Sequence, residues 1–89
     1  MTVGAIALKR LKLANVRAQC QLTQKQLAEQ AHLSRTTVHF AEHNLPISRI
    51  SAYSILKVLN PIRQDIGLPT LDIGDINWTI QGEGRTHKT

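Results

Sequence analysis

An interrupted helix near the middle of the chain constrains the fold more than any other feature. Residues 28–40 read AEQAHLSRTTVHF. The stretch predicts two short helices separated by a break at His32-Leu33-Ser34. Ser34 is a typical N-cap, because its hydroxyl accepts a hydrogen bond from the backbone N–H of Thr36 or Thr37. Helices joined by so tight a turn cross at a steep angle, so the break sets the direction of the second helix.

The rest of the chain also favours helices. Hydrophobic residues make up 42% of the sequence and aromatic residues only 3%, so the expected core is aliphatic, which suits packed helices. Thr23 and Gln26 form a capping-box pattern at the start of one helix, and Pro61 suits the first position of another. The expected fold class is all-α, with five helices over about residues 4–20, 24–31, 35–43, 49–59 and 61–66.

The pattern changes after Leu71, where apolar and polar residues alternate as in a strand, with a slip at Gly74-Asp75. A single strand is not stable alone in water, so this one needs a partner. We therefore expect a dimerisation or partner-binding segment at 69–81, after a helix-turn-helix domain at 1–68 and before a disordered tail at 82–89. The side chains expected to mediate dimerisation are Ile73, Ile76, Trp78 and Ile80.

Charge is unevenly distributed along the chain, whose formal net charge is +5. Residues 1–63 carry nine lysines and arginines against Glu29 and Glu42, whereas residues 64–89 carry two basic residues against four acidic ones. A basic body indicates a polyanionic partner. Charge that serves only solubility is the alternative, and composition leaves it open.

Cys20 is the only cysteine in the sequence, so no internal disulfide can form and a reducing compartment is expected. We expect Cys20 to be a small buried apolar residue and the protein to be cytoplasmic. The longest apolar run, Val3 to Leu8, is too short to span a membrane, so no membrane association is expected.

The outer face of the helix that follows Ser34 is polar. Arg35, Thr36, His39 and His43 lie on it, and they supply hydrogen-bond donors without a carboxylate. An α-helix fits the major groove of double-stranded DNA, and the N–H groups at its N-terminus favour phosphate. These properties favour DNA as the partner.

The stretch LTQKQLAEQAHLSRTTVHFAEHN, residues 22–44, resembles the helix-turn-helix of the lambda-repressor-like (xenobiotic-response-element) family. The resemblance is close over 13–44 and loose over 45–66. It is carried by Arg17, Leu22-Thr23-Gln24, Leu27-Ala28, Leu33-Ser34 and Val38 through Glu42. It implies a five-helix DNA-binding domain.

The resemblance also implies roles for individual residues. Gln24 would bind a phosphate and brace the recognition helix, while Arg35, Thr36 and Phe40 occupy base-facing positions. The full set of expected DNA-binding residues is Thr23, Gln24, Ser34, Arg35, Thr36, Thr37, His39, Phe40, His43 and Asn44.

Arg17 and Glu42 occupy positions that form a partly buried ion pair in the family. Two residues depart from its pattern. His32 stands where glycine is usual, although histidine tolerates the left-handed backbone region. Phe40 replaces a commonly polar residue; its ring cannot hydrogen-bond to a base edge, but it can contact a thymine methyl group.

These features predict a sequence-specific, double-stranded DNA-binding transcriptional regulator, a repressor that acts as a homodimer on a palindromic operator. The alternative is the antitoxin of a type II toxin–antitoxin module, which would bind a toxin and repress its own operon. Small size and the strand-like segment 71–80 motivate that alternative. The antitoxins of kinase-toxin operons look similar, with a C-terminal strand that pairs across the dimer.

An enzyme is not expected, because the sequence has no glycine-rich phosphate loop, no nucleophile with an adjacent base and no paired carboxylates in a plausible pocket. No cofactor is expected either. His39 and His43 are four residues apart and could share a metal ion with Glu42 or His32. Further ligands are missing from the pattern, so no metal site is predicted.

Overall fold

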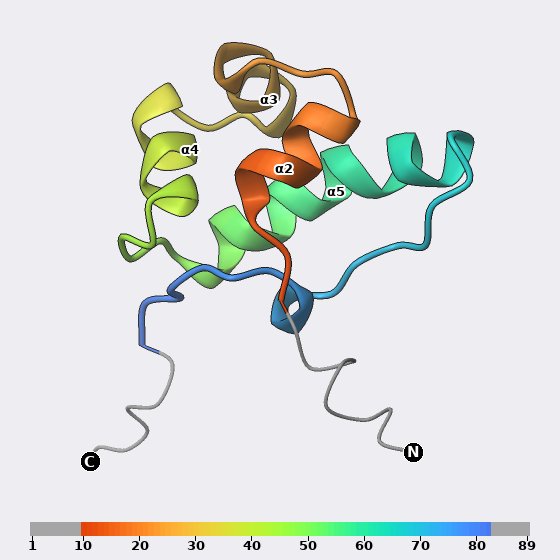
Figure 1. Cartoon of the computed structure of the whole chain (residues 1–89). Coiled ribbons are helices and arrows are strands. Elements are labelled where there is room, and N and C mark those ends of the chain that lie inside the picture. The colour runs from red at the N-terminus through yellow and green to blue at the C-terminus, as the bar shows by residue number, and fades with distance from the viewer. Residues whose placement is uncertain (1–9, 83–89) are drawn as a thin grey trace, which may run out of the picture.

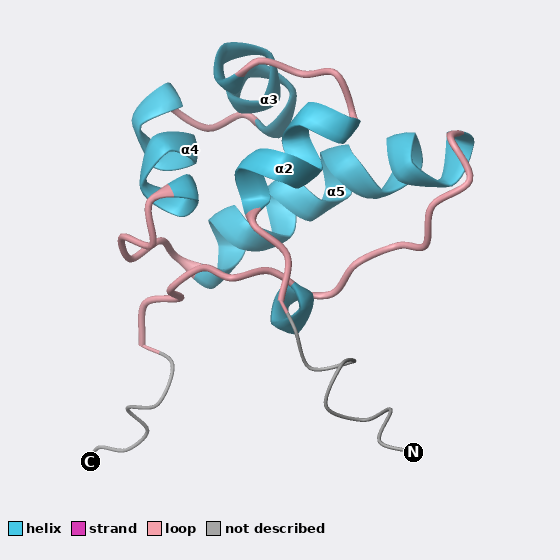
Figure 2. Cartoon of the chain, in the orientation of Figure 1, coloured by secondary structure: helices cyan, strands magenta, loops and turns pink. Residues whose placement is uncertain are grey.

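Four α-helices form most of the chain between residues 10 and 82, the part that the structure, a computed structural model, describes (Figures 1 and 2). They are α2 (Leu13–Gln19), α3 (Gln24–Ala31), α4 (Arg35–Glu42) and α5 (Arg49–Asp65), followed by a short 3-10 helix, η1 (Ile73–Asp75). The all-α class is confirmed, with four helices rather than five. Within the same residues, no helix has the length and apolar character needed to cross a bilayer.

The predicted break between two helices is present between α3 and α4. Thr23 caps α3, because its Oγ1 accepts a hydrogen bond from the Gln26 N–H at 3.0 Å while Gln26 Oε1 accepts from the Thr23 N–H at 2.8 Å. Ser34 caps α4 by accepting from the Thr37 N–H at 3.1 Å. His32 ends α3 in the left-handed conformation, at φ 59° and ψ 41°. These local features confirm the sequence interpretation.

Within the described residues, the helix predicted over about 4–20 is present only as α2, which begins at Leu13, so residues 10–12 are not helical as expected. Leu11 cannot extend it, because its backbone pairs with the C-terminal segment: the Leu11 N–H donates to Asp75 O at 2.9 Å, and the Asn77 N–H donates to Leu11 O at 2.8 Å. The remainder of the predicted start, residues 1–9, lies outside the described residues.

The predicted fourth and fifth helices are one continuous helix, α5, with Pro61 inside it. Proline removes a helical hydrogen bond, but Pro61 is exposed, and the turn beyond it makes contacts that favour the helix. Arg63, only 4% exposed, donates from Nε to Pro69 O at 2.8 Å and from Nη1 to Gln19 Oε1 at 3.0 Å. These contacts are the physical reason that the predicted helix end near residue 60 is wrong.

The predicted C-terminal strand is also wrong. Residues 71–80 contain η1, which accounts for the slip at Gly74-Asp75. Among residues 10–82 their β-type pairing is limited to two isolated parallel bridges, Leu11 with Ile76 and Ile47 with Ile80. The apolar alternation reflects burial instead of sheet pairing: Ile76, Trp78 and Ile80 point into the core, and the residues between them are exposed.

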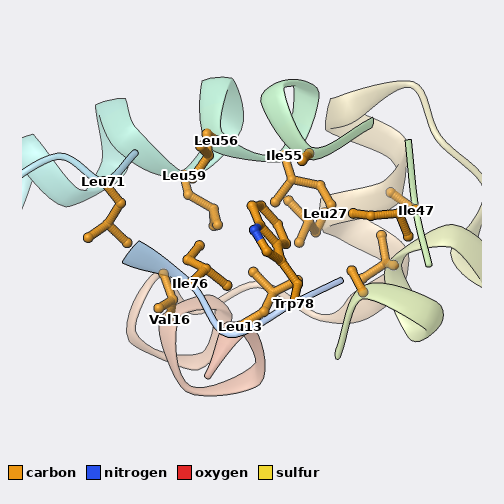
Figure 3. Close-up of a cluster of buried hydrophobic side chains, with 14 of the residues drawn as sticks. Leu13, Val16, Leu27, Ile47, Ile55, Leu56, Leu59, Leu71, Ile76 and Trp78 are labelled. Carbon is orange, nitrogen blue, oxygen red and sulfur yellow. The ribbon is translucent and has the colours of Figure 1, made fainter. Parts of the chain in front are cut away.

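The C-terminal segment completes the hydrophobic core of the helical unit (Figure 3). Trp78 lies among side chains of α2 and α5, is 6% exposed, and donates from Nε1 to Ile73 O at 3.0 Å. Cys20 is buried in the same core, as predicted. Leu71, Ile76, Trp78 and Ile80 belong to this core, so the segment predicted at 69–81 packs against the helices.

This burial affects two sequence-based expectations. Ile76, Trp78 and Ile80 fill the chain's own core, and Ile73 is half-buried against it, so these side chains are not displayed to a second copy. The antitoxin hypothesis stays a prediction, but the strand that motivated it is not present in residues 71–80.

Candidate nucleic-acid interface

Helix α4 lies at the edge of the molecule and presents one face to solvent (Figure 1). Val38 and Ala41 are fully buried on its inner face, where α4 packs against α3. Ala28 of α3 is buried as well, as expected for a small residue where two helix backbones approach. The outer face carries Arg35 and Thr36, both exposed, in the first turn. The predicted outward orientation of α4 is confirmed.

The single carboxylate of α4, Glu42, turns away from the exposed face. Arg17 of α2 donates to it from Nε and, at 3.2 Å, from Nη2, so the expected ion pair is present. The Glu42 side chain is 4% exposed and the Arg17 side chain 20%. Arg17 also donates from Nη1 to Leu22 O at 2.9 Å, which ties the α2–α3 connection to the same network.

Gln24 joins this network from the start of α3, with Nε2 donating to Glu42 Oε1 at 2.9 Å. This hydrogen bond ties the start of α3 to α4, as expected for a bracing role of Gln24, whereas a recognition role for α4 and the phosphate contact of Gln24 stay predictions. The first turn of α3 also carries Lys25, an exposed cation that the sequence reasoning did not single out. The sequence did contain a signal for Lys25, because this basic residue directly follows Gln24, which was expected to bind a phosphate.

The environment of Glu42 keeps it charged. Burial by itself raises the pKa of the carboxyl, but hydrogen bonds from Arg17 and Gln24, the positive charge of Arg17 and a smaller electrostatic contribution from His43 together outweigh burial. The pKa therefore lies below its usual range. An ionised Glu42 holds α2, α3 and α4 together without placing negative charge on the outer face of α4.

A shallow hollow lies between the start of α3 and the outer face of α4, lined by Gln24, Arg35, Thr36 and His39. The backbone N–H groups of the first turn of α4 have no intrahelical partner, by helix geometry, and the helix dipole adds positive potential there. Guanidinium, hydroxyl, imidazole and amide groups around one hollow are suited to phosphate oxygens and to base edges.

Aromatic rings continue this surface along α4. The rings of His39 and His43 stack with centroids 4.0 Å apart, and His43 Nδ1 lies 2.8 Å from His39 O. Phe40 is 39% exposed beside His39. Asn44 follows in an exposed turn with φ 59°. The predicted residues of α4 thus share one exposed edge with the residues that follow the helix.

Three predicted DNA-binding residues have hydroxyl groups that already serve the local fold. Thr23 and Ser34 cap their helices, and the Thr37 hydroxyl lies 3.0 Å from Ser34 Oγ. Thr23 and Ser34 are exposed and Thr37 is half-buried. Their first role is to fix where α3 and α4 begin, and their contact with DNA stays a prediction.

Comparisons with known proteins assign no family to this interface. No family model, no curated protein and no solved structure matches the chain.

Proposed function

We propose that the protein is a cytoplasmic, sequence-specific DNA-binding transcriptional regulator, a repressor whose helix α4 enters the major groove of double-stranded DNA. The observation that carries this proposal is the exposed face of α4. It presents Arg35, Thr36 and His39, while the only carboxylate of the helix is turned inward onto Arg17. A helix with this distribution of charge attracts DNA instead of repelling it.

Several groups on this surface have a chemical counterpart in DNA. Arg35 is suited to the O6 and N7 atoms of guanine, the commonest specific contact in the major groove, and Phe40 is suited to a thymine methyl group. One amide hydrogen of Gln24 is engaged by Glu42, which leaves the other for a phosphate. The N-termini of α3 and α4 add backbone N–H groups for further phosphates.

The proposed regulator acts as a homodimer on a palindromic operator. A single helix contacts at most a few base pairs, which does not discriminate one operator from the competing sites of a genome. Two copies related by two-fold symmetry place their α4 helices in successive major grooves, about 34 Å apart, and this multiplies the discrimination.

The proposal is tested by selecting duplexes from a random library with the purified chain and measuring affinity for the winners. We expect affinity to fall steeply between about 50 and about 200 mM salt, because phosphate contacts release counterions. Arg35→Ala should weaken binding by about tenfold or more and relax preference at one base position.

Arg10→Ala is the matched control, because it removes the same charge beside Ile73 and Gly74, away from α3 and α4. It should change affinity by less than Arg35→Ala and leave base preference intact. The proposal is overturned if no duplex is enriched, or if the two variants have the same effect.

A further inference from the structure

We propose that the outward face of α5, centred on Tyr53, is the surface through which two copies of this chain pair about a two-fold axis. The inference rests on the proposed function for the need of a dimer and names the surface that forms it. The segment expected to dimerise does not offer that surface, because Ile76, Trp78 and Ile80 are buried in their own chain.

The first half of this surface projects from the helix. Ile50 is 79% exposed, the most exposed large hydrophobic residue within residues 10–82, and Tyr53 is 50% exposed. The two are three residues apart, so they lie on the same face of α5. Apolar side chains grouped on one exposed helix face typically mark a contact surface.

The second half is a groove of about 390 Å³, and Tyr53 forms part of its lining. Leu56 and Pro61 of α5 form part of its lining, and Leu71 forms another part. The Asn60 side chain fixes these walls, because Nδ2 donates to Leu71 O at 3.0 Å and Oδ1 accepts from the Leu71 N–H at 2.8 Å. These two hydrogen bonds fix Leu71 against α5 and so define the shape of the groove.

A projecting aromatic and a receiving groove on one surface suit a two-fold dimer. In such an interface each residue contact occurs twice, so the same patch must carry both halves. Tyr53 of each copy would enter the groove of the other. A different protein could bind using either the projecting side chain or the groove alone. The presence of both on one surface therefore favours a second copy of this chain as the occupant.

Charge on the edges of the groove supports the same occupant. Lys57 and Asp72 both line it and are exposed, and neither has an ion-pair partner within the described residues. A two-fold axis through the groove would place Lys57 of one copy against Asp72 of the other, twice. The groove shares no residue with the hollow on α4, so DNA and a second copy can be bound together.

The test is sedimentation of the full chain without DNA over a concentration series. We expect reversible dimerisation in the micromolar range. Tyr53→Ala should weaken association by about tenfold or more, since aromatic residues dominate contact energies. Gln64→Ala, at an exposed position of the same helix, is the control and should leave association unchanged.

A charge exchange between copies gives the sharper test. Lys57→Asp alone places like charges together at both contacts, and so does Asp72→Lys alone, so each variant should be monomeric at concentrations where the wild type is dimeric. In a mixture of the two variants both contacts are attractive again, and dimers should return. Thermal unfolding of each variant shows separately that it is folded.

The inference is overturned if the wild type is monomeric throughout, if Tyr53→Ala associates like the wild type, or if mixing the charge variants restores nothing. Its failure differs from failure of the proposed function. A chain that dimerises but enriches no duplex overturns only DNA binding. A chain that binds selected duplexes yet never pairs through this surface overturns only the inference.

Discussion

Glu42 receives hydrogen bonds from two different helices, although it belongs to the helix that is proposed to bind DNA. Arg17 and Gln24 both donate to its carboxylate. This arrangement stabilises the position of α4 and removes a negative charge from its outer face. The Glu42 carboxylate is nearly inaccessible to water. If Arg17 or Gln24 were removed, the negative charge of Glu42 would therefore lose a hydrogen bond that water cannot easily replace.

Glu42→Gln is expected to lower the free energy of unfolding at neutral pH by about 2 kcal/mol, because a neutral amide replaces a charge that accepts several hydrogen bonds. The pKa of Glu42 is lower in the folded state than in the unfolded chain, where glutamate has a pKa of about 4.3. The stabilisation by Glu42 is therefore fully present above that unfolded value and is lost as the pH falls through the folded-state pKa.

Urea unfolding from about pH 7 to about pH 3 measures this effect, with stability of the wild type falling more steeply in acid than that of Glu42→Gln. Glu29→Gln, at an exposed position of α3, is the control and should follow the wild type. Parallel curves for the wild type and Glu42→Gln would contradict the role assigned to this carboxylate.

At the scale of elements, the turn between α3 and α4 depends on one unusual backbone conformation. His32 occupies the left-handed region, which costs most non-glycine residues about 1 kcal/mol. Its N–H donates to Glu29 O at 3.3 Å, and the Leu33 N–H donates to Ala28 O at 2.9 Å, so the turn closes α3. The direction of α4 follows from this closure.

His32→Gly is expected to stabilise the fold by up to about 1 kcal/mol, because glycine adopts the left-handed conformation without strain. Gln30→Gly, inside α3 and exposed, should instead destabilise by about 1 kcal/mol, since glycine is a poor helix former. Denaturant unfolding of both variants measures the contrast. Destabilisation of similar size at both positions would show that strain at His32 is negligible.

The C-terminal segment belongs to the core in this account. Trp78→Ala should therefore reduce the free energy of unfolding by about 3 to 5 kcal/mol, as large core truncations do. Thr79→Ala, at the exposed neighbouring position, should change it by less than about 0.5 kcal/mol. A Trp78→Ala variant that unfolds like the wild type would mean that the segment does not contribute to the core.

Features decided by near neighbours in the chain were predictable from the sequence. The caps at Thr23 and Ser34 involve residues three positions apart, whereas the left-handed conformation of His32 was expected from the family resemblance. The continuity of α5 was not predictable, because it depends on Arg63 reaching Gln19, 44 positions away. Leu11 and Ile76, which pair through their backbones, lie even farther apart in the sequence, so the apolar alternation of residues 71–80 was the only visible signal and it indicated a strand.

In the candidate site, too, local features were predictable from the sequence and long-range contacts were not. The periodicity of α4 indicated which side chains face outward, and the structure confirms it for Arg35 and Thr36. The Arg17–Glu42 pair joins residues 25 positions apart, and its expectation depended on the family resemblance, since spacing gives no reason for it. The groove beside Tyr53 depends on Leu71 packing near α5, which sequence reasoning assigned to a separate segment.

At the scale of the whole molecule, two surfaces with different chemistry are built on one core. The outer face of α4 and the start of α3 carry cationic and polar groups around a hollow. The outer face of α5 carries exposed apolar side chains beside a groove. The first surface suits a polyanion and the second suits another copy of the chain, which together are what an operator-binding dimer needs.

Whether α4 enters DNA can be observed by nuclear magnetic resonance of the isotope-labelled chain titrated with a selected duplex. We expect the largest amide shifts at Gln24, Arg35, Thr36, His39 and Phe40. Amides around the Tyr53 groove should move little once dimerisation is saturated. Shifts concentrated away from α4, with the amides of Arg35 and Thr36 unmoved, would contradict the claim.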